Sequence, residues 1–178
     1  MATTKLLIAG SGGQGVMVMG QMIAKAGILE GKEVTYLPSY GPEMRGGTAN
    51  CSVIISDETI GCPVIDAPTD IVVMNVASMR KFEGKVQAGG RMFVNQSLIN
   101  EAPSRDDITV YQVDAAEIAK GRLGNEKTAN MVMLGAIVRM TGVVKLESVH
   151  KVIEKTFAGK KAEMIPLNLR ALEAWSAD

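Results

Sequence analysis

Residues 5–15 read KLLIAGSGGQG, a short apolar run that passes directly into a glycine-rich turn. The run over residues 5–9 is bounded by Gly10, which is typical of a central strand covered on both faces. Gly10, Gly12 and Gly15 match the pattern G-x-G-x-x-G, and residues 14–30 are predicted to form a helix. A strand, a glycine turn and a helix in this order predict the first unit of an α/β domain.

The remaining sequence continues the alternation of strands and helices. Further strands are expected at 34–37, 50–56, 70–75, 91–95 and 108–113. Helices are expected at 76–83, 114–122, 128–140 and 146–157, with a short one between 166 and 175. Such alternation favours a largely parallel sheet with helices on both faces. We therefore expect one α/β domain over residues 1–178, a Rossmann-like three-layer α/β/α sandwich with a mostly parallel or mixed sheet.

Two of the predicted helices are unusually apolar. Hydrophobic residues make up 47% of the chain and aromatic residues only 4%, with 12 methionines, so the core is expected to be aliphatic and adaptable. The helix over 14–30 keeps its polar residues on one narrow stripe, and the helix over 128–140 is apolar nearly all round. Both patterns predict helices that are covered on more than one side. Gly20, Ala24 and Gly27 form a smooth strip for close packing, which a sheet alone could explain.

Composition excludes several classes of function. Lys+Arg and Asp+Glu number 19 each, and no segment is strongly basic, so a nucleic acid partner is not expected. Apolar stretches are interrupted before the roughly 20 residues that a membrane span requires. The apolar run near the N-terminus is too short for the core of a secretion signal. We therefore expect a cytoplasmic protein.

Metal-ligating and nucleophilic side chains are scarce. Cys51, Cys62 and His150 are the only thiols and imidazole, so Cys and His cannot build a closed four-ligand metal or iron–sulfur site here. Cys51 falls on an apolar strand and is expected to be an inert thiol. His150 is expected to pair with Glu147 or Glu154 on its own helix. No catalytic residue is assigned.

The glycine turn has three open interpretations. Its candidate binding residues are Gly10, Gly12, Gly13, Gln14 and Gly15. Free N–H groups at the helix start could bind the phosphates of a dinucleotide. Nicotinamide enzymes, however, hold the ribose with an acid at the end of the second strand, and residues 37–40 read LPSY. The alternatives are a purely structural turn or a loop that binds an anion or a partner. Gln14 either reaches a ligand or neighbouring chain, or faces solvent.

A second loop, SYGPEMRGGT over residues 39–48, follows the second strand. It is expected at the same edge of the sheet as the glycine turn, where open α/β sheets form their binding crevice. Arg45 with two following glycines offers a guanidinium and unshielded N–H groups to a phosphate or carboxylate. The alternative is an exposed loop with a weak surface pair between Glu43 and Arg45. Its candidate binding residues are Tyr40, Gly41, Glu43, Arg45, Gly46 and Gly47.

Two asparagines complete the candidate site. Asn75 ends a predicted strand at the same edge and could either make a turn or bind a ligand. Asn130 lies near the start of the apolar helix, where its amide could hold a loop, cap the helix or touch a ligand.

Together these segments resemble the gamma subunit family of the 2-oxoacid:ferredoxin oxidoreductases. The resemblance spans nearly the whole chain in order and length, and the C-terminal tail is its least distinctive part. It is carried by residues 10–16 (GSGGQGV), 39–47 (SYGPEMRGG), 50–53 (NCSV), 127–130 (KTAN) and 133–136 (MLGA). The form of the second loop looks more like the 2-oxoglutarate, branched-chain and general ketoacid branches than the pyruvate branch. An indolepyruvate-type enzyme keeps a similar module.

The resemblance implies an accessory subunit and not a complete enzyme. In that family the complex converts a 2-oxoacid and coenzyme A to acyl-CoA and carbon dioxide and passes two electrons through [4Fe-4S] clusters to ferredoxin. Thiamine diphosphate and Mg²⁺ lie between alpha and beta subunits, and the clusters lie on beta or on a small ferredoxin-like delta subunit. The expected partners of this chain are those subunits, it is expected to bind no cofactor tightly, and a share of the coenzyme A site is implied.

Competing hypotheses place the chain in other functional classes. A stand-alone NAD(P)-binding dehydrogenase would need an acid/base group, and His150 is poorly placed for one. A nucleotide-binding regulatory module is the third option. Whether the isolated chain forms a homodimer is left open.

Overall fold

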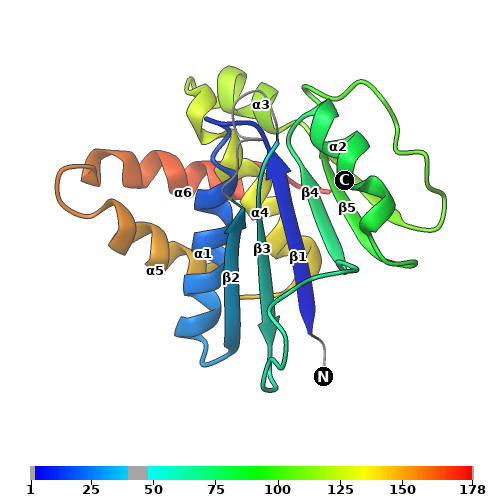
Figure 1. Cartoon of the computed structure of the whole chain (residues 1–178). Coiled ribbons are helices and arrows are strands. Elements are labelled where there is room, and N and C mark those ends of the chain that lie inside the picture. Colours follow the sequence, from blue (N-terminus) through cyan, green and yellow to red (C-terminus); the bar gives the residue numbers. More distant parts are fainter. Residues whose placement is uncertain (1–2, 40–47, 178) are drawn as a thin grey trace.

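A computed structural model describes residues 3–39 and 48–177 (Figure 1). Six strands form one sheet in the order β2-β3-β1-β4-β5-β6. The strands are β1 (Thr4–Gly10), β2 (Glu33–Ser39), β3 (Ala49–Ser56), β4 (Asp70–Val73), β5 (Arg91–Asn95) and β6 (Thr109–Val113). The helices are α1 (Val16–Leu29), α2 (Val76–Phe82), α3 (Ala115–Glu117), α4 (Ala129–Thr141), α5 (Leu146–Phe157) and α6 (Ile165–Glu173). Short 3-10 turns cover Glu83–Lys85, Glu126–Thr128 and Ala162–Met164.

The sheet is mixed. β1, β4, β5 and β6 run parallel, whereas β3 runs antiparallel to both of its neighbours, β1 and β2. The reason is the connection between β2 and β3, because a parallel return needs a crossover of a dozen or more residues and only nine separate Ser39 from Ala49. The expected mixed α/β sandwich is confirmed, and the expectation of a largely parallel sheet holds for four of the six strands.

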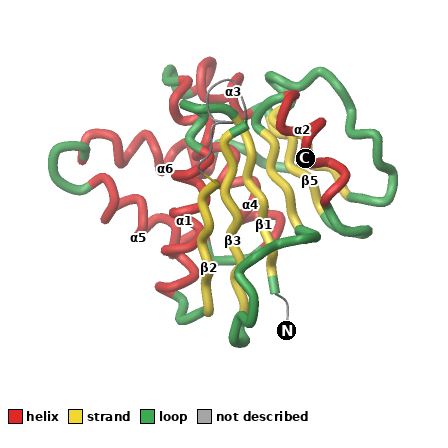
Figure 2. The backbone as a smooth tube through the Cα atoms, in the orientation of Figure 1, coloured by secondary structure: helices red, strands yellow, loops and turns green. Residues whose placement is uncertain are grey.

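Helices lie on both faces of the sheet (Figure 2). Side chains of β1 alternate between two cores: Leu6 and Ile8 point to the face that carries α1, α4, α5 and α6, and Leu7 points to the face that carries α2. The first core is much the larger. The second is closed by Met79 and Phe82 of α2 and its following turn.

Helix α4 is the buried helix that its sequence predicts. Every residue from Asn130 to Val138 is buried, because the sheet, α1, α3 and α6 surround it. Gly135 lies against the backbone of α6, where a Cβ would come 1.9 Å from the Leu172 carbonyl oxygen. Gly142 ends the helix in the left-handed conformation, as expected.

Helix α1 is covered on two sides. Gly20 packs against Cys51 and Tyr36, and Gly27 packs against Val34, so the smooth strip serves contact with the sheet. Helix α5 lies along another side of α1 (Figure 1). At the carboxyl end of α1, however, Ile28 and Leu29 stay exposed.

A buried ion pair joins the amino ends of β4 and β5 to α4. The carboxylate of Asp70 is fully buried and lies 2.5 Å from Nε of Arg91. Thr69 donates a hydrogen bond to the same carboxylate, and Arg91 donates a further one to the carbonyl oxygen of Met140 at the end of α4. These contacts fix β4, β5 and α4 relative to one another.

Local differences from the sequence expectations are few. The helix expected at 114–122 is a three-residue α-helical turn followed by a π-helical segment, Ile118–Arg122. His150 lies 3.2 Å from Glu173 of α6 and not beside an acid of its own helix, because the packing of α5 on α6 brings the two together. No helix within 3–39 or 48–177 combines the length and apolarity that crossing a membrane demands.

Candidate functional site

The candidate site lies where β1, β4 and β5 end at one edge of the sheet. β1 and β4 are parallel neighbours. After β1 the chain passes through α1 on one face, and after β4 it passes through α2 on the other face. Such a divergence of neighbouring parallel strands opens a crevice beyond their carboxyl ends, where α/β proteins bind ligands.

The glycine turn is closed by the side chain of Gln14. Its Oε1 accepts a hydrogen bond from the backbone N–H of Ser11 at 2.7 Å, and its Nε2 donates one to the carbonyl oxygen of Met74 at 3.1 Å. This amide therefore joins the turn to the end of β4. The sequence suggested either an outward-reaching or a solvent-facing side chain, and the structure shows an internal clamp that also lines the crevice.

Three of the four glycines in the turn are required by its geometry. A Cβ on Gly10 would lie 2.7 Å from Oε1 of Gln14, and Gly13 and Gly15 adopt φ angles of 87° and 73°. Gly12 differs, because it is exposed and a Cβ there meets nothing within 4 Å. The backbone N–H groups of Gly12, Gly13 and Gly15 donate no hydrogen bond to any described residue. They are available to an anion.

Asn130 packs directly on the turn. A Cβ on Gly15 would lie 2.3 Å from the amide nitrogen of Asn130, so the third glycine makes room for this side chain. Asn130 is only 8% exposed, yet no described residue within hydrogen-bonding distance pairs with its amide. The residue as a whole is buried, and its amide lines the crevice, where water or a ligand can reach it.

Asn95, the last residue of β5, links the carboxyl end of that strand to β4 and α3. Its side chain is fully buried, donates to the carbonyl oxygen of Met74 at 3.4 Å and accepts from the N–H of Ala116 at 3.4 Å. The carbonyl of Met74 thus receives amides from both sides. The sequence did not single out Asn95, although a polar residue closing the apolar strand 91–95 is a usable signal.

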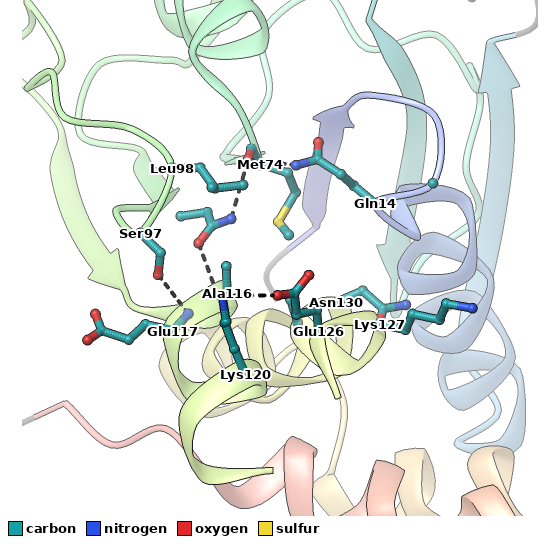
Figure 3. A pocket seen from close by; sticks show the side chains of 13 residues that line it. Gln14, Met74, Ser97, Leu98, Ala116, Glu117, Lys120, Glu126, Lys127 and Asn130 are labelled. Carbon is teal, nitrogen blue, oxygen red and sulfur yellow. Dashed lines mark hydrogen bonds and ion pairs between the residues drawn. The ribbon is translucent and has the colours of Figure 1, made fainter. Parts of the chain in front are cut away.

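These elements enclose a cavity of about 600 Å³, within the range of small-molecule sites (Figure 3). Its lining comes from the glycine turn, the ends of β4 and β5, α3 and the start of α4. The lining residues are Gly13, Gln14, Met74, Asn95, Ser97, Leu98, Ala116, Glu117, Lys120, Glu126, Lys127, Ala129 and Asn130. The residues from α3 to Lys127 were not predicted as a site, because nothing in the sequence brings residues 116–127 to the glycine turn.

Charges gather on one wall of the cavity. Lys120 and Glu126 form a loose exposed pair at 3.5 Å, and the ammonium group of Lys127 has no acidic partner among the residues described. Figure 3 shows Lys127 beside Asn130 at the start of α4. The cavity therefore combines the N–H group of Gly13, two lysines and two glutamates with an apolar surface around Leu98 and Ala116.

Asn75 has a structural position. Its Oδ1 accepts a hydrogen bond from the N–H of Ser78 at 2.8 Å and caps α2. It does not line the cavity. The sequence left open whether Asn75 makes a turn or binds a ligand. The observed hydrogen bond is a local one that shapes the chain at the start of α2, and a ligand contact remains a prediction.

The second loop is placed only through its ends. Tyr40, Gly41, Glu43, Arg45, Gly46 and Gly47 lie outside the described residues. Ser39 pairs with Asn50, and Ala49 pairs with Gly10. The loop therefore leaves the sheet at the edge that carries the glycine turn, as the sequence predicted.

The topology disfavours a nicotinamide cofactor. In the dinucleotide-binding fold the second strand lies next to the first and presents the ribose-binding acid beside the glycine turn. Here β3 lies between β1 and β2, which displaces the end of β2 from the turn. The sequence lacks the ribose-binding acid, and the strand order also differs from that of the dinucleotide-binding fold.

The cavity is equipped for binding more clearly than for catalysis. Its one hydroxyl among the described lining residues, Ser97, accepts a hydrogen bond from the N–H of Glu117, and no imidazole or thiol accompanies it. No group of three or more Cys, His, Asp or Glu side chains within the described ranges could hold a metal ion. A nucleophile paired with a base is therefore not visible here.

Comparison with known proteins identifies related chains. The family of pyruvate ferredoxin/flavodoxin oxidoreductases matches residues 5–175. The ketoisovalerate oxidoreductase subunit VorA of Methanothermobacter marburgensis is 39% identical over 96% of this chain. The chain spans only 35% of the length of that relative. The 2-oxoglutarate synthase subunit KorC of Methanocaldococcus jannaschii is 34% identical over 84% of this chain and 81% of its own length.

Solved structures share the fold. The gamma subunit of the keto/oxoacid ferredoxin oxidoreductase of Geobacter sulfurreducens superposes with a TM-score of 0.83 at 30% identity, covering 96% of this chain and 95% of that one. The 2-oxoglutarate:ferredoxin oxidoreductase of Magnetococcus marinus superposes with a TM-score of 0.88 at 23% identity. It covers 97% of this chain but only 30% of its own length, and at this identity the likeness establishes the fold alone.

Proposed function

This chain belongs to the pyruvate ferredoxin/flavodoxin oxidoreductase family, and from that membership we propose that it acts as the gamma subunit of a 2-oxoacid:ferredoxin oxidoreductase. The proposed complex converts a 2-oxoacid and coenzyme A to acyl-CoA and carbon dioxide and transfers two electrons to ferredoxin. The Geobacter sulfurreducens gamma subunit, which matches almost end to end, supports this role. The lone chain is proposed to be inactive, and residues 1–178 are proposed to form one domain.

The crevice at the end of β1, β4 and β5 is proposed to hold part of coenzyme A. The observation that carries this proposal is the position of the Asn130 amide, which lines the cavity and lies directly against Gly15 of the glycine turn. The nucleotide end of coenzyme A is anionic, so Lys127 and the N–H groups of the glycine turn suit it. The related enzyme of Magnetococcus marinus was solved with 2-oxoglutarate, coenzyme A and succinyl-CoA bound, which supports coenzyme A as the ligand.

The second loop is proposed to complete this crevice. Its Ala49 end pairs with Gly10 of the glycine turn, its Ser39 end lies one strand further along the same edge, and its arginine and glycines suit a phosphate. We propose that Arg45 contacts the anion, with Tyr40, Gly41, Glu43, Gly46 and Gly47 forming the rest of the loop. Asn75 is proposed as a supporting residue at the same edge.

The substrate of the complex is proposed to be 2-oxoglutarate or another ketoacid. Relatives act, by name, as ketoisovalerate oxidoreductase and 2-oxoglutarate synthase subunits, and a pyruvate synthase subunit PorC of Methanocaldococcus jannaschii is 32% identical. The first two names agree with the branch that the second loop indicates. Selection among 2-oxoacids is proposed to lie on the partner subunits.

The resident cofactors are proposed to lie on those partners. The two thiols of this chain do not fit a cluster, because Cys51 is buried on β3 while Cys62 is exposed in the connection after β3. Thiamine diphosphate, Mg²⁺ and [4Fe-4S] clusters are therefore assigned to alpha, beta and a ferredoxin-like delta subunit. Both thiols are free, which supports a reducing, cytoplasmic location.

The experiment that tests the crevice measures the apparent KM for coenzyme A of the assembled complex. Asn130→Ala and Arg45→Ala are each expected to raise this KM by about tenfold, the equivalent of one hydrogen bond to a charged or polar group. The matched control is Asn100→Ala, which removes an exposed amide outside the cavity. Unchanged KM values in both site variants would remove coenzyme A from this crevice while leaving the subunit assignment intact.

A further inference from the structure

A second hollow lies between the ends of α1 and α5. This α1–α5 groove has a volume of about 340 Å³ and is lined by Lys25, Ile28, Leu29, Val152, Lys155 and Thr156. Its floor is apolar, because Ile28 and Leu29 are 63% and 46% exposed and Val152 lies between the two helices. Figure 1 shows the two helices side by side, away from the end of the sheet that carries the glycine turn.

The exposure of Ile28 and Leu29 contradicts the pattern of their helix. The apolar sequence of α1 predicts cover on more than one side, and the sheet and α5 supply that cover along most of its length. Only the last turn of α1, with Ile28 and Leu29, is left uncovered. Burying one large apolar side chain is worth about 1.5–3 kcal/mol, so two adjacent exposed ones favour a contact with another surface.

The rim of the groove is basic. Lys25 and Lys155 both line it, and neither ammonium group has an acidic partner among residues 3–39 and 48–177. The nearby carboxylate of Glu30 is engaged, since it accepts a hydrogen bond from the N–H of Lys145. An apolar floor between two unpaired lysines is complementary to an apolar side chain flanked by carboxylates.

The charge argues against a second copy of this chain. In a two-fold symmetric contact the same patch meets itself, so the two lysines of one copy would face those of the other. Like charges brought together oppose association. A different protein with acidic residues fits the groove better.

We infer that the α1–α5 groove is the docking surface for an acidic, apolar-centred segment of a partner subunit of the oxidoreductase complex. This inference rests on the proposed function. Two further observations support it: the same module makes up only 35% of the ketoisovalerate oxidoreductase relative and 30% of the Magnetococcus marinus chain. In those proteins the module is joined to a larger body, and the inferred occupant of the groove in this case is a partner subunit.

The test measures the dissociation constant between this chain and the purified alpha–beta subunits of the same complex. Ile28→Ala and Lys155→Glu are each expected to weaken binding by about tenfold or more, as for central interface residues. The matched controls are Val64→Ala, with a 59% exposed apolar side chain outside the groove, and Lys85→Glu, with an exposed lysine on the other face of the sheet. Both controls should bind like the wild type.

Four other outcomes decide the proposal. Wild-type affinity in both groove variants overturns the docking surface while the proposed function stands. Binding that is insensitive to added salt overturns the acidic partner, because complementary charges are screened. Self-association of the isolated wild type that Ile28→Ala abolishes would make the occupant a second copy. Failure of the wild-type chain to bind the subunits at all overturns both the groove and the proposed function.

Discussion

The glycines of the turn over residues 10–15 differ in what the fold requires of them. Gly15 combines a φ of 73° with direct contact to Asn130, whereas Gly12 has open space around its Cα and no positive φ. The motif therefore contains positions that the fold needs and one position, Gly12, that the fold does not need. A change at Gly12 can therefore test the proposed binding without disturbing the turn.

Substitution of these two glycines should change stability to very different extents. Gly15→Ala is expected to lower the free energy of unfolding by about 2 kcal/mol or more, because alanine is strained at positive φ and its Cβ meets the Asn130 amide. Gly12→Ala should change it by less than about 0.5 kcal/mol, as at other open surface sites. Urea denaturation of both variants measures the difference, and equal losses would show that the turn is not built as described.

The Cys51 thiol gives a prediction about pH. Burial raises the pKa of Cys51 to about 12, which agrees with an inert thiol. Between about pH 9 and 12 the unfolded chain loses this proton and the folded chain keeps it, so the free energy of unfolding falls by about 1.4 kcal/mol per pH unit. Below that window the thiol has no effect on the slope.

The comparison of wild type with Cys51→Ala isolates this effect from other groups that titrate in alkali. The wild type should lose stability more steeply above pH 9, as measured by urea unfolding at a series of pH values. In the native protein a thiol reagent should label the exposed Cys62 rapidly and Cys51 only after unfolding. Fast labelling of both thiols would contradict the buried position of Cys51.

Part of the site could be read from single residues. The glycine turn, Gln14 and Asn130 were predicted as candidates, and the structure brings them together. The clamp formed by Gln14 could not be predicted, because its acceptor, the carbonyl of Met74, lies 60 residues away. Asn95 and Lys120 reach the cavity only through tertiary packing, which no local pattern records.

Packing between elements depends on close contact of α4 with α6. Gly135 allows the backbone of Leu172 to approach so closely that any Cβ must displace it. Gly135→Ala is therefore expected to cost about 3 kcal/mol, near the upper end for overpacking. Gly121→Ala is the control, because nothing lies within 4 Å of its Cβ position. Thermal unfolding should show a large shift for the first variant only; similar midpoints would mean that α4 and α6 separate easily.

The ion pair between β4 and β5 should matter far more than a surface pair. Arg91→Leu leaves the fully buried carboxylate of Asp70 without its cation and is expected to cost about 3–5 kcal/mol. Arg80→Leu removes an exposed pair with Glu101 and should change the free energy of unfolding far less, because solvent screens that pair. Urea denaturation measures the free energy of unfolding of both variants. A small loss in both would show that water reaches Asp70.

The positions of the helices and strands were predicted better than the relative directions of the strands in the sheet. The apolar helix over 128–140 and the strands over 50–56 and 91–95 follow from local pattern, and they lie where the sequence put them. The reversal of β3 was missed in the expectation of a largely parallel sheet. The signal was present, since only nine residues separate Ser39 from Ala49, and that length is too short for a parallel crossover.

At the scale of the whole molecule, the two hollows lie on different parts of the surface and have different chemistry. The crevice at the strand ends offers amides and charged groups of both signs, while the α1–α5 groove offers an apolar floor between lysines. This division fits a subunit that binds a substrate at one surface and partner subunits at another. The sequence indicated the crevice through its motifs, but an exposed groove between two distant helices has no sequence signature.

This chain is proposed to serve a complex and to catalyse nothing alone. The test is 2-oxoacid- and coenzyme A-dependent reduction of a viologen dye by the chain alone, by the purified partner subunits, and by the two combined. We expect no turnover by the chain, little by the partners without it, and full activity only on recombination. Oxidation or reduction of a small molecule by the isolated chain, with a nicotinamide or a dye as acceptor, would contradict this proposal.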